Sequence, residues 1–156
     1  MPKEIPVPID LQEFLPYRLS IVTNKVSRSL GNLYADRFDL SIAEWRVMAV
    51  LGQYKDLSAD QVCIKTEMDK VTVSRAVTKL LNKKLIDRKF SDQDKRRSML
   101  QLSRSGDAIY AQIVPLATRF EQQLSDVFSK QEQKQFNKLL DKLNQRATKL
   151  FEFELD

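Results

Sequence analysis

The sequence predicts a mainly α-helical protein that carries one short β-hairpin. Its five prolines stand at positions 2, 6, 8, 16 and 115, so the long middle of the chain lacks the strongest helix breaker. Apolar residues recur there at spacings of three and four, as on one face of a helix. Only residues 85–90 and 98–102 change to a strand-like pattern, around a polar tip at residues 91–97.

The N-terminal part predicts an extended arm and then a long helix. Three of the first nine residues are proline, which favours extended backbone. A helix is predicted over residues 11–36, with Pro16 in its first turns, where a missing amide does least harm. Its apolar face consists of Leu15, Leu19, Val22, Val26, Leu30 and Leu33.

Further helix starts are marked by capping residues. A serine followed three residues later by Glu or Gln forms a capping box. Three such pairs occur: Ser41 with Glu44, Ser58 with Gln61 and Ser129 with Glu132. They predict helices over residues 42–54, 59–66 and 130–150, respectively. Asp69 is an N-cap for a helix over residues 70–83, and Ser103 is one for a long helix over residues 104–128. The core face predicted for residues 70–83 is Val71, Ala76, Val77 and Leu80, with Val73 flanking it.

This order of elements predicts a winged helix-turn-helix. A short helix, a tight turn and a second helix form the helix-turn-helix unit, and the hairpin follows directly. Residues 69–104 contain eleven basic and four acidic side chains, a net of +7, although the whole chain is only +5. A local excess of positive charge favours a polyphosphate partner such as DNA. A solvated charged face is the alternative.

Composition argues against an enzyme. The chain has no histidine, one cysteine (Cys63) and three scattered glycines. This excludes Ser-His and Cys-His pairs, a phosphate-cradling glycine loop and the usual zinc ligands. We therefore expect no catalytic residues, no metal and no cofactor.

The same features predict a cytoplasmic protein. One cysteine cannot form an internal disulfide, and the N-terminus lacks the pattern of a signal peptide. No apolar run approaches the roughly 20 residues of a membrane span, so no membrane partner is expected.

The run from Asp94 to Gly106 resembles the wing of the multiple antibiotic resistance regulator (MarR) family of bacterial transcription factors, in which Asp-x-Arg precedes an alternating strand and Leu-Thr-x-x-Gly. Leu85-Ile86-x-Arg88 fits the strand that enters the wing, and residues 71–75 with 80–81 fit the recognition helix. The resemblance covers about residues 11–150. Two departures are Ser103 in place of Thr, and Lys84 where the family turns on Gly. Lys84 would need an unfavourable backbone if its φ is positive.

The resemblance implies a ligand-responsive homodimer that binds double-stranded DNA at a pseudo-palindromic operator. Its two recognition helices would lie about 34 Å apart, and it would act as a repressor released by a small aromatic or phenolic acid. Residues 1–36 would form the arm and a dimerisation helix, residues 37–104 the DNA-binding lobe, and residues 105–156 the C-terminal dimerisation helices, all in one intertwined unit.

The predicted DNA contacts lie on the recognition helix and the wing. Arg75 suits bidentate contact with a guanine edge, while lysines including Lys83 suit phosphates. The resemblance places Arg96 in a minor groove. Asp94, as an anion, is expected to hold a wing arginine by a charge-assisted hydrogen bond rather than to contact DNA. The full set is Lys70, Thr72, Ser74, Arg75, Thr78, Lys79, Arg88, Asp94, Arg96 and Arg97.

The candidate effector anchors are Arg18, Ser27, Trp45 and Arg46, although each arginine could instead form a surface ion pair, for example with Glu44 or Asp39. A rival sensor is Cys63 as a peroxide-responsive thiol, but its neighbours Val62 and Ile64 favour a structural role. Other classes left open are an architectural or RNA-binding winged-helix protein without ligand control, and a helical protein whose basic patch meets an acidic protein or membrane surface.

Overall fold

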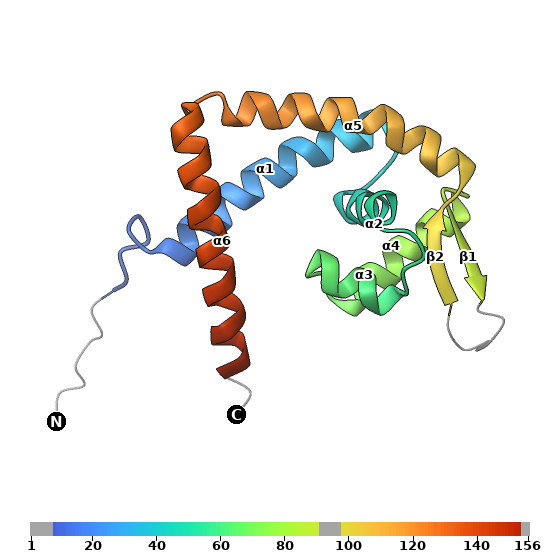
Figure 1. Ribbon diagram of the computed structural model, residues 1–156, viewed down its shortest axis with the longest axis horizontal. Coiled ribbons are helices and arrows are strands. Elements are labelled where there is room, and N and C mark those ends of the chain that lie inside the picture. The colour runs from blue at the N-terminus through green and yellow to red at the C-terminus, as the bar shows by residue number, and fades with distance from the viewer. Residues whose placement is uncertain (1–7, 91–97, 154–156) are drawn as a thin grey trace. The chain divides into compact units, whose positions relative to one another are not determined.

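The computed structural model describes residues 8–90 and 98–153 and confirms the predicted fold class (Figure 1). In chain order, the elements of these residues are α1 (Leu15–Phe38), α2 (Ile42–Gln53), α3 (Ala59–Thr66), α4 (Lys70–Asn82), β1 (Ile86–Phe90), β2 (Ser98–Leu102), α5 (Arg104–Ser125) and α6 (Lys130–Phe153). The chain divides into two compact units, Met1–Ile113 and Val114–Asp156, so α5 contributes to both. No helix in the described segments is both long and apolar enough to cross a membrane.

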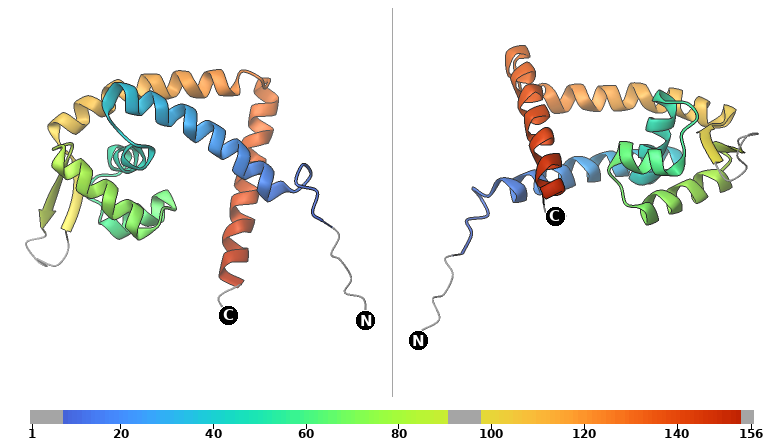
Figure 2. Two further views of the ribbon diagram at one scale, coloured as in Figure 1. Left: turned by 180° about the vertical axis from the view of Figure 1, so that it is seen from behind. Right: turned by 60° about the horizontal axis from the view of Figure 1, so that its bottom comes forward.

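The first unit holds the hydrophobic core, and α2, α3, α4 and the hairpin pack around it (Figures 1 and 2). β1 and β2 pair antiparallel, with Ile86 opposite Leu102. Leu57 forms an isolated antiparallel bridge to β2: its N–H donates to the carbonyl of Leu100 at 3.2 Å, and its carbonyl accepts from the N–H of Leu100 at 2.7 Å. The buried apolar core is Tyr34, Leu40, Val47, Met48, Leu51, Leu57, Val62, Val73, Ala76, Val77, Leu80, Leu85, Ile86, Leu100 and Ile113.

The predicted caps are present. Ser41, Ser58 and Ser129 each form both hydrogen bonds of a capping box. At the start of α4, Asp69 accepts from the N–H of Thr72 at 2.8 Å and from its hydroxyl at 2.6 Å. These bonds from Thr72 lower the pKa of the Asp69 carboxyl below its ordinary value, and they fix the first turn of α4.

Several helix boundaries differ from prediction: α1 ends at Phe38 instead of residue 36, α6 ends at Phe153 instead of residue 150, and α2 and α4 each end one residue early. Two further differences have a visible cause. α1 begins at Leu15 instead of residue 11, because Pro16 has no N–H to complete an earlier helical turn; residues 11–13 form a turn instead. α5 ends at Ser125 instead of residue 128, and the side-chain amide of Gln133 donates to the carbonyls of Ser125 and Phe128. These bonds satisfy carbonyl groups that the end of the helix leaves free.

The core face of α4 also differs from prediction. Val71 was expected in the core, but its exposure is 58%, whereas Val73 is buried with 1% exposure. The buried residues Val73, Ala76, Val77 and Leu80 follow the spacing i, i+3, i+4, i+7 of a single helical face. Val71 lies outside this face because two residues along a helix turn the side chain by roughly 200°.

The junction between the hairpin and α5 depends on close backbone contact. Lys84 has φ 58°, the left-handed conformation anticipated for this position. Its carbonyl accepts hydrogen bonds from the hydroxyls of Ser103 at 2.7 Å and Ser105 at 2.8 Å. A Cβ at Gly106 would lie 1.9 Å from the carbonyl oxygen of Leu85. Glycine is therefore required here by contact with the backbone of Leu85, just before β1, rather than by its own φ.

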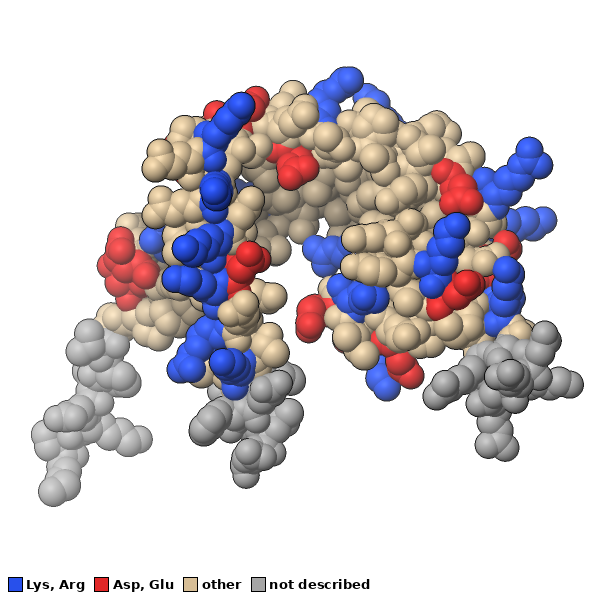
Figure 3. All heavy atoms as spheres, viewed as in Figure 1, with Lys and Arg blue, Asp and Glu red and all other residues tan. Residues whose placement is uncertain are grey.

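In the second unit, α6 is amphipathic. Five of its six basic side chains recur every four residues, and Figure 3 shows Lys and Arg side chains in a column along this helix. These residues are Lys130, Lys134, Lys138, Lys142 and Arg146. Its large apolar side chains remain exposed, namely Phe136, Leu139, Leu140 and Leu150. Phe136 stacks on Phe128, with ring centroids 5.5 Å apart.

Candidate nucleic-acid interface

The outward face of α4 is the centre of the candidate interface. α4 has 13 residues and so measures roughly 20 Å, enough to lie along a major groove. Its buried face packs on the core, and the opposite face carries basic and hydroxyl side chains. The exposed residues among those predicted to contact DNA are Lys70, Ser74, Arg75, Thr78 and Lys79, whereas Thr72 is half-buried.

Several of these polar side chains already have partners within the protein. Lys70 pairs with Asp60 at 3.5 Å, but both are highly exposed, so this pair is weak and leaves Lys70 accessible. The hydroxyl of Thr72 donates to Asp69, and that of Thr78 donates to the carbonyl of Ser74 at 2.9 Å. Both threonine hydroxyls can therefore still accept hydrogen bonds from DNA, but their hydrogens are already donated within the protein.

Arg75 is thus the side chain of this face best suited to donate to a base. It is exposed on α4, and a guanidinium offers several N–H donors in a planar arrangement. On the hairpin, Arg88 is exposed in β1, opposite Leu100 in the strand register. The remaining predicted wing contacts, Asp94, Arg96 and Arg97, lie outside the described residues.

The four candidate effector anchors lie on α1 and α2. Arg18 and Arg46 are exposed, and Ser27 and Trp45 are half-buried. Trp45 contacts two aromatic rings that sequence reasoning missed: Tyr34 of α1, with centroids 5.2 Å apart, and Tyr110 of α5, with centroids 5.7 Å apart. Burial raises the pKa of Tyr34, so its hydroxyl is neutral at pH 7.

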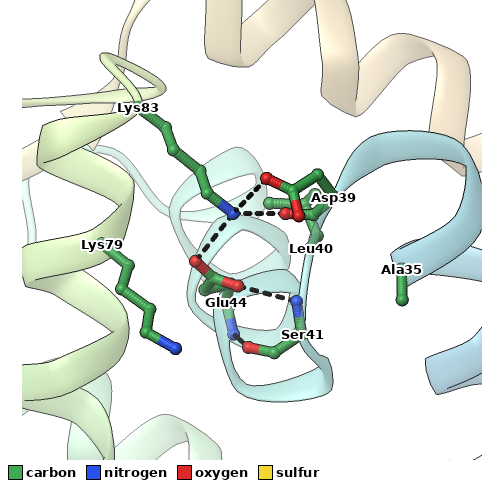
Figure 4. Close-up of a pocket in the computed structure, with 7 residues that line it drawn as sticks. All are labelled: Ala35, Asp39, Leu40, Ser41, Glu44, Lys79 and Lys83. Carbon is green, nitrogen blue, oxygen red and sulfur yellow. Dashed lines mark hydrogen bonds and ion pairs between the residues drawn. The ribbon is translucent and has the colours of Figure 1, made fainter.

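An open pocket of about 460 Å³ lies where α1, α2 and α4 meet, and it includes none of these four residues (Figure 4). Lys83, at the end of α4, points into it and bonds the backbone carbonyl of Asp39. Its ammonium nitrogen also lies 3.3 Å from the Asp39 carboxylate and 3.2 Å from Oε1 of Glu44. The pocket lining is Ala35, Asp39, Leu40, Ser41, Glu44, Lys79 and Lys83.

Glu44 is the buried member of this ion-pair cluster, with 2% exposure. Its Oε2 accepts from the N–H of Ser41 at 2.7 Å, while Oε1 has no hydrogen bond of acceptable geometry and depends on the charge of Lys83. Burial raises the pKa of Glu44, but the hydrogen bonds from Ser41 and the positive charge of Lys83 outweigh it, so the pKa is lowered overall. Glu44 is therefore ionised at neutral pH.

This cluster changes two expectations. Glu44 and Asp39 were considered as partners for the arginines, but both carboxylates pair with Lys83. Lys83 was expected to contact phosphate, yet it bonds α1 and α2. The capping box at Ser41 could be found in the sequence, whereas the pairing of Glu44 with a lysine 39 positions later could not.

Two other kinds of site, a metal centre and a reactive thiol, can also be checked in the described residues. In residues 8–90 and 98–153, no group of three or more His, Cys, Asp or Glu side chains could hold a metal ion. Cys63 is a half-buried free thiol that packs against the core from α3.

Comparison with known proteins agrees with this architecture. Residues 38–97 match the model of the MarR family. An uncharacterised HTH-type transcriptional regulator of Bacillus cereus is 29% identical over 133 residues, covering 85% of this chain and 88% of the relative.

Solved structures share the fold over most of the chain. A MarR/EmrR family transcriptional regulator from Acinetobacter sp. ADP1 has a TM-score of 0.85 and 28% identity, covering 90% of this chain and 99% of that one. The S. aureus MepR–DNA complex has a TM-score of 0.78 at 21% identity, covering 85% and 98%. Residues 38–97 are thus similar to the MarR family, and the chain shares the winged helix fold of solved MarR-family transcriptional regulators.

Proposed function

We propose that the protein is a cytoplasmic homodimeric repressor that binds a pseudo-palindromic operator and is released by a small aromatic carboxylate. The observation that carries the DNA-binding part is the outward face of α4, where Arg75 and Lys79 stand opposite the buried face. In this proposal α4 lies in the major groove, with Arg75 on a guanine edge and Lys70 and Lys79 on phosphates. Arg88, Asp94, Arg96 and Arg97 serve the wing, and Arg96 enters the minor groove.

Exposed apolar faces support the homodimer. Soluble monomers rarely leave large contiguous apolar surfaces open to water. Large apolar side chains are exposed on α1 and, in the second unit, on α6. We assign residues 1–36 and 105–156 to dimerisation and residues 37–104 to DNA binding. A two-fold axis would then place the two α4 helices about one DNA turn apart. The S. aureus MepR complex supports DNA binding by this fold, because that neighbour was solved with DNA.

The effector part of the proposal depends on Trp45. Its half-buried indole contacts the rings of Tyr34 and Tyr110, and Arg46 follows it on the same helix. Arg18 and Ser27 would complete the site. If an effector favours a spacing of the α4 helices that does not fit DNA, DNA must weaken effector binding by the same factor.

The first test measures DNA binding. A duplex selected from random sequences by the purified protein is titrated by fluorescence anisotropy, alongside a random duplex. We expect a preference for the selected duplex of about 10³-fold, and a dimer by light scattering. Arg75→Ala should reduce this preference more than it weakens binding to the random duplex. Arg96→Ala should weaken operator binding without changing thermal unfolding.

Lys142→Ala is the control for charge, because it removes one positive charge from α6, outside α4 and the wing, and light scattering checks that it remains a dimer. A strict monomer would contradict the homodimer. Equal affinity for selected and random duplexes would favour an architectural or RNA-binding role. For the effector, Trp45 fluorescence is titrated with salicylate and benzoate; no change in fluorescence or in DNA affinity would contradict an aromatic carboxylate.

A further inference from the structure

We propose that Val71 reads DNA sequence by packing against the 5-methyl group of a thymine. This inference rests on the proposed placement of α4 in a major groove. It starts from the position of Val71, which is 58% exposed although the valine two residues later is buried.

Val71 stands in the middle of the outward face of α4. It precedes Arg75 by four residues and Thr78 by seven, so in an ideal helix the three side chains lie within roughly 60° of one another. The four buried residues of α4 lie on the opposite side. Any groove that receives Arg75 along this face therefore also receives Val71.

The other side chains of the first turn of α4 either have partners within the protein or, like Lys70, are assigned to a phosphate. Lys70 faces Asp60 at 3.5 Å, the hydroxyl of Thr72 donates to Asp69 at 2.6 Å, and Val73 is buried. The N-terminal residues of a recognition helix are those that contact base edges. In this turn, Val71 is the side chain that combines an outward position with no polar group of its own.

The chemistry of valine then selects the base. In the major groove, thymine is the base that presents a methyl group, next to its O4 acceptor, whereas the recognition groups of the other bases are hydrogen-bond donors and acceptors. A valine against such an edge would remove a polar group from water without pairing it. Val71 and Arg75 are roughly 6 Å apart along the helix axis, so the thymine should lie within about two base pairs of the guanine contacted by Arg75.

The test removes the methyl group from the DNA and the valine from the protein. In the selected duplex, each thymine within about three base pairs of the Arg75-dependent guanine is replaced singly by deoxyuridine, which differs only in the missing methyl. At one position we expect the wild-type protein to lose about threefold to tenfold in affinity, the effect of one buried methyl group. Val71→Ala should bind the thymine and deoxyuridine duplexes equally.

Val71→Thr is the matched control, because it keeps the branched shape and one methyl group and should retain part of the discrimination. Both variants should unfold at the wild-type temperature, since the replaced side chain is exposed. If deoxyuridine is tolerated at every position, or if Val71→Ala still discriminates, the inference is wrong. If Arg75→Ala also leaves base preference unchanged, the placement of α4 itself is wrong, which distinguishes the two failures.

Discussion

Replacing Gly106 by alanine should destabilise the fold far more than the same change at the other glycines. The new Cβ would lie 1.9 Å from the carbonyl oxygen and 2.9 Å from the carbonyl carbon of Leu85. Because real Cβ atoms essentially never come within 3.0 Å of another heavy atom, α5 and the backbone at Leu85 would have to move apart by at least about 1 Å. Both sides of the contact are backbone, so no side chain can rotate away.

The cost can be worked out from the contacts at this junction. Overpacking costs about 1–3 kcal/mol, and separating the two segments also strains the Ser103 cap and its bond to Lys84, each worth about 1 kcal/mol. Alanine regains about 1 kcal/mol of helix propensity. We expect a net loss of about 3 kcal/mol, which lowers the urea midpoint by about 1–2 M for a domain of this size.

The assay is urea unfolding followed by circular dichroism at one fixed protein concentration, because association would make stability concentration-dependent. Gly31→Ala is the control: its Cβ meets only the flexible side chain of Ile42 at 3.3 Å, so stability should stay equal or rise by up to about 1 kcal/mol. Gly52→Ala should fall between the two, because it meets the movable ring of Tyr110 at 2.6 Å. Equal midpoints for Gly106→Ala and Gly31→Ala would refute the reasoning.

Three further predictions concern single side chains. Glu44→Gln should lower the free energy of unfolding by about 2 kcal/mol at pH 7. Because the folded pKa of Glu44 is lowered, the greater stability of the wild type should be fully present above the ordinary pKa of Glu and should disappear as the pH falls through the folded pKa. Unfolding of both proteins from pH 7 to pH 3 checks this. Lys84→Gly should raise stability by about 0.5–1 kcal/mol by relieving the positive φ, measured against Lys84→Ala, which should not. Cys63→Ala should leave DNA affinity and its response to hydrogen peroxide unchanged; loss of a peroxide response that the wild type shows would instead establish a thiol sensor.

The sequence predicted most of the fold because its signals are local. A capping box is decided by residues three positions apart, so the starts of α2, α3 and α6 were found to the residue. The strain at Lys84 could be anticipated for the same reason, because it depends on a single position: a lysine occupies a turn that needs a left-handed backbone.

What could not be predicted depends on contacts between distant segments. Val71 and Val73 are equally apolar, and only the packing of α4 on the core decides which is buried. The pairing of Lys83 with Glu44 and Asp39 joins three helices and leaves no periodic trace in the sequence. The roles of Asp94, Arg96 and Arg97 stay predictions, because these residues lie outside the described part of the chain.

The ion-pair cluster has a mechanical consequence for the recognition helix. One ammonium group, at the end of α4, is held by the last backbone turn of α1 and by the buried carboxylate at the start of α2. Sliding α4 away from α1 would strand Glu44 without a counter-charge in a site that water hardly reaches, which is strongly unfavourable. Any movement of α4 relative to α1 and α2 therefore carries the cost of breaking this cluster.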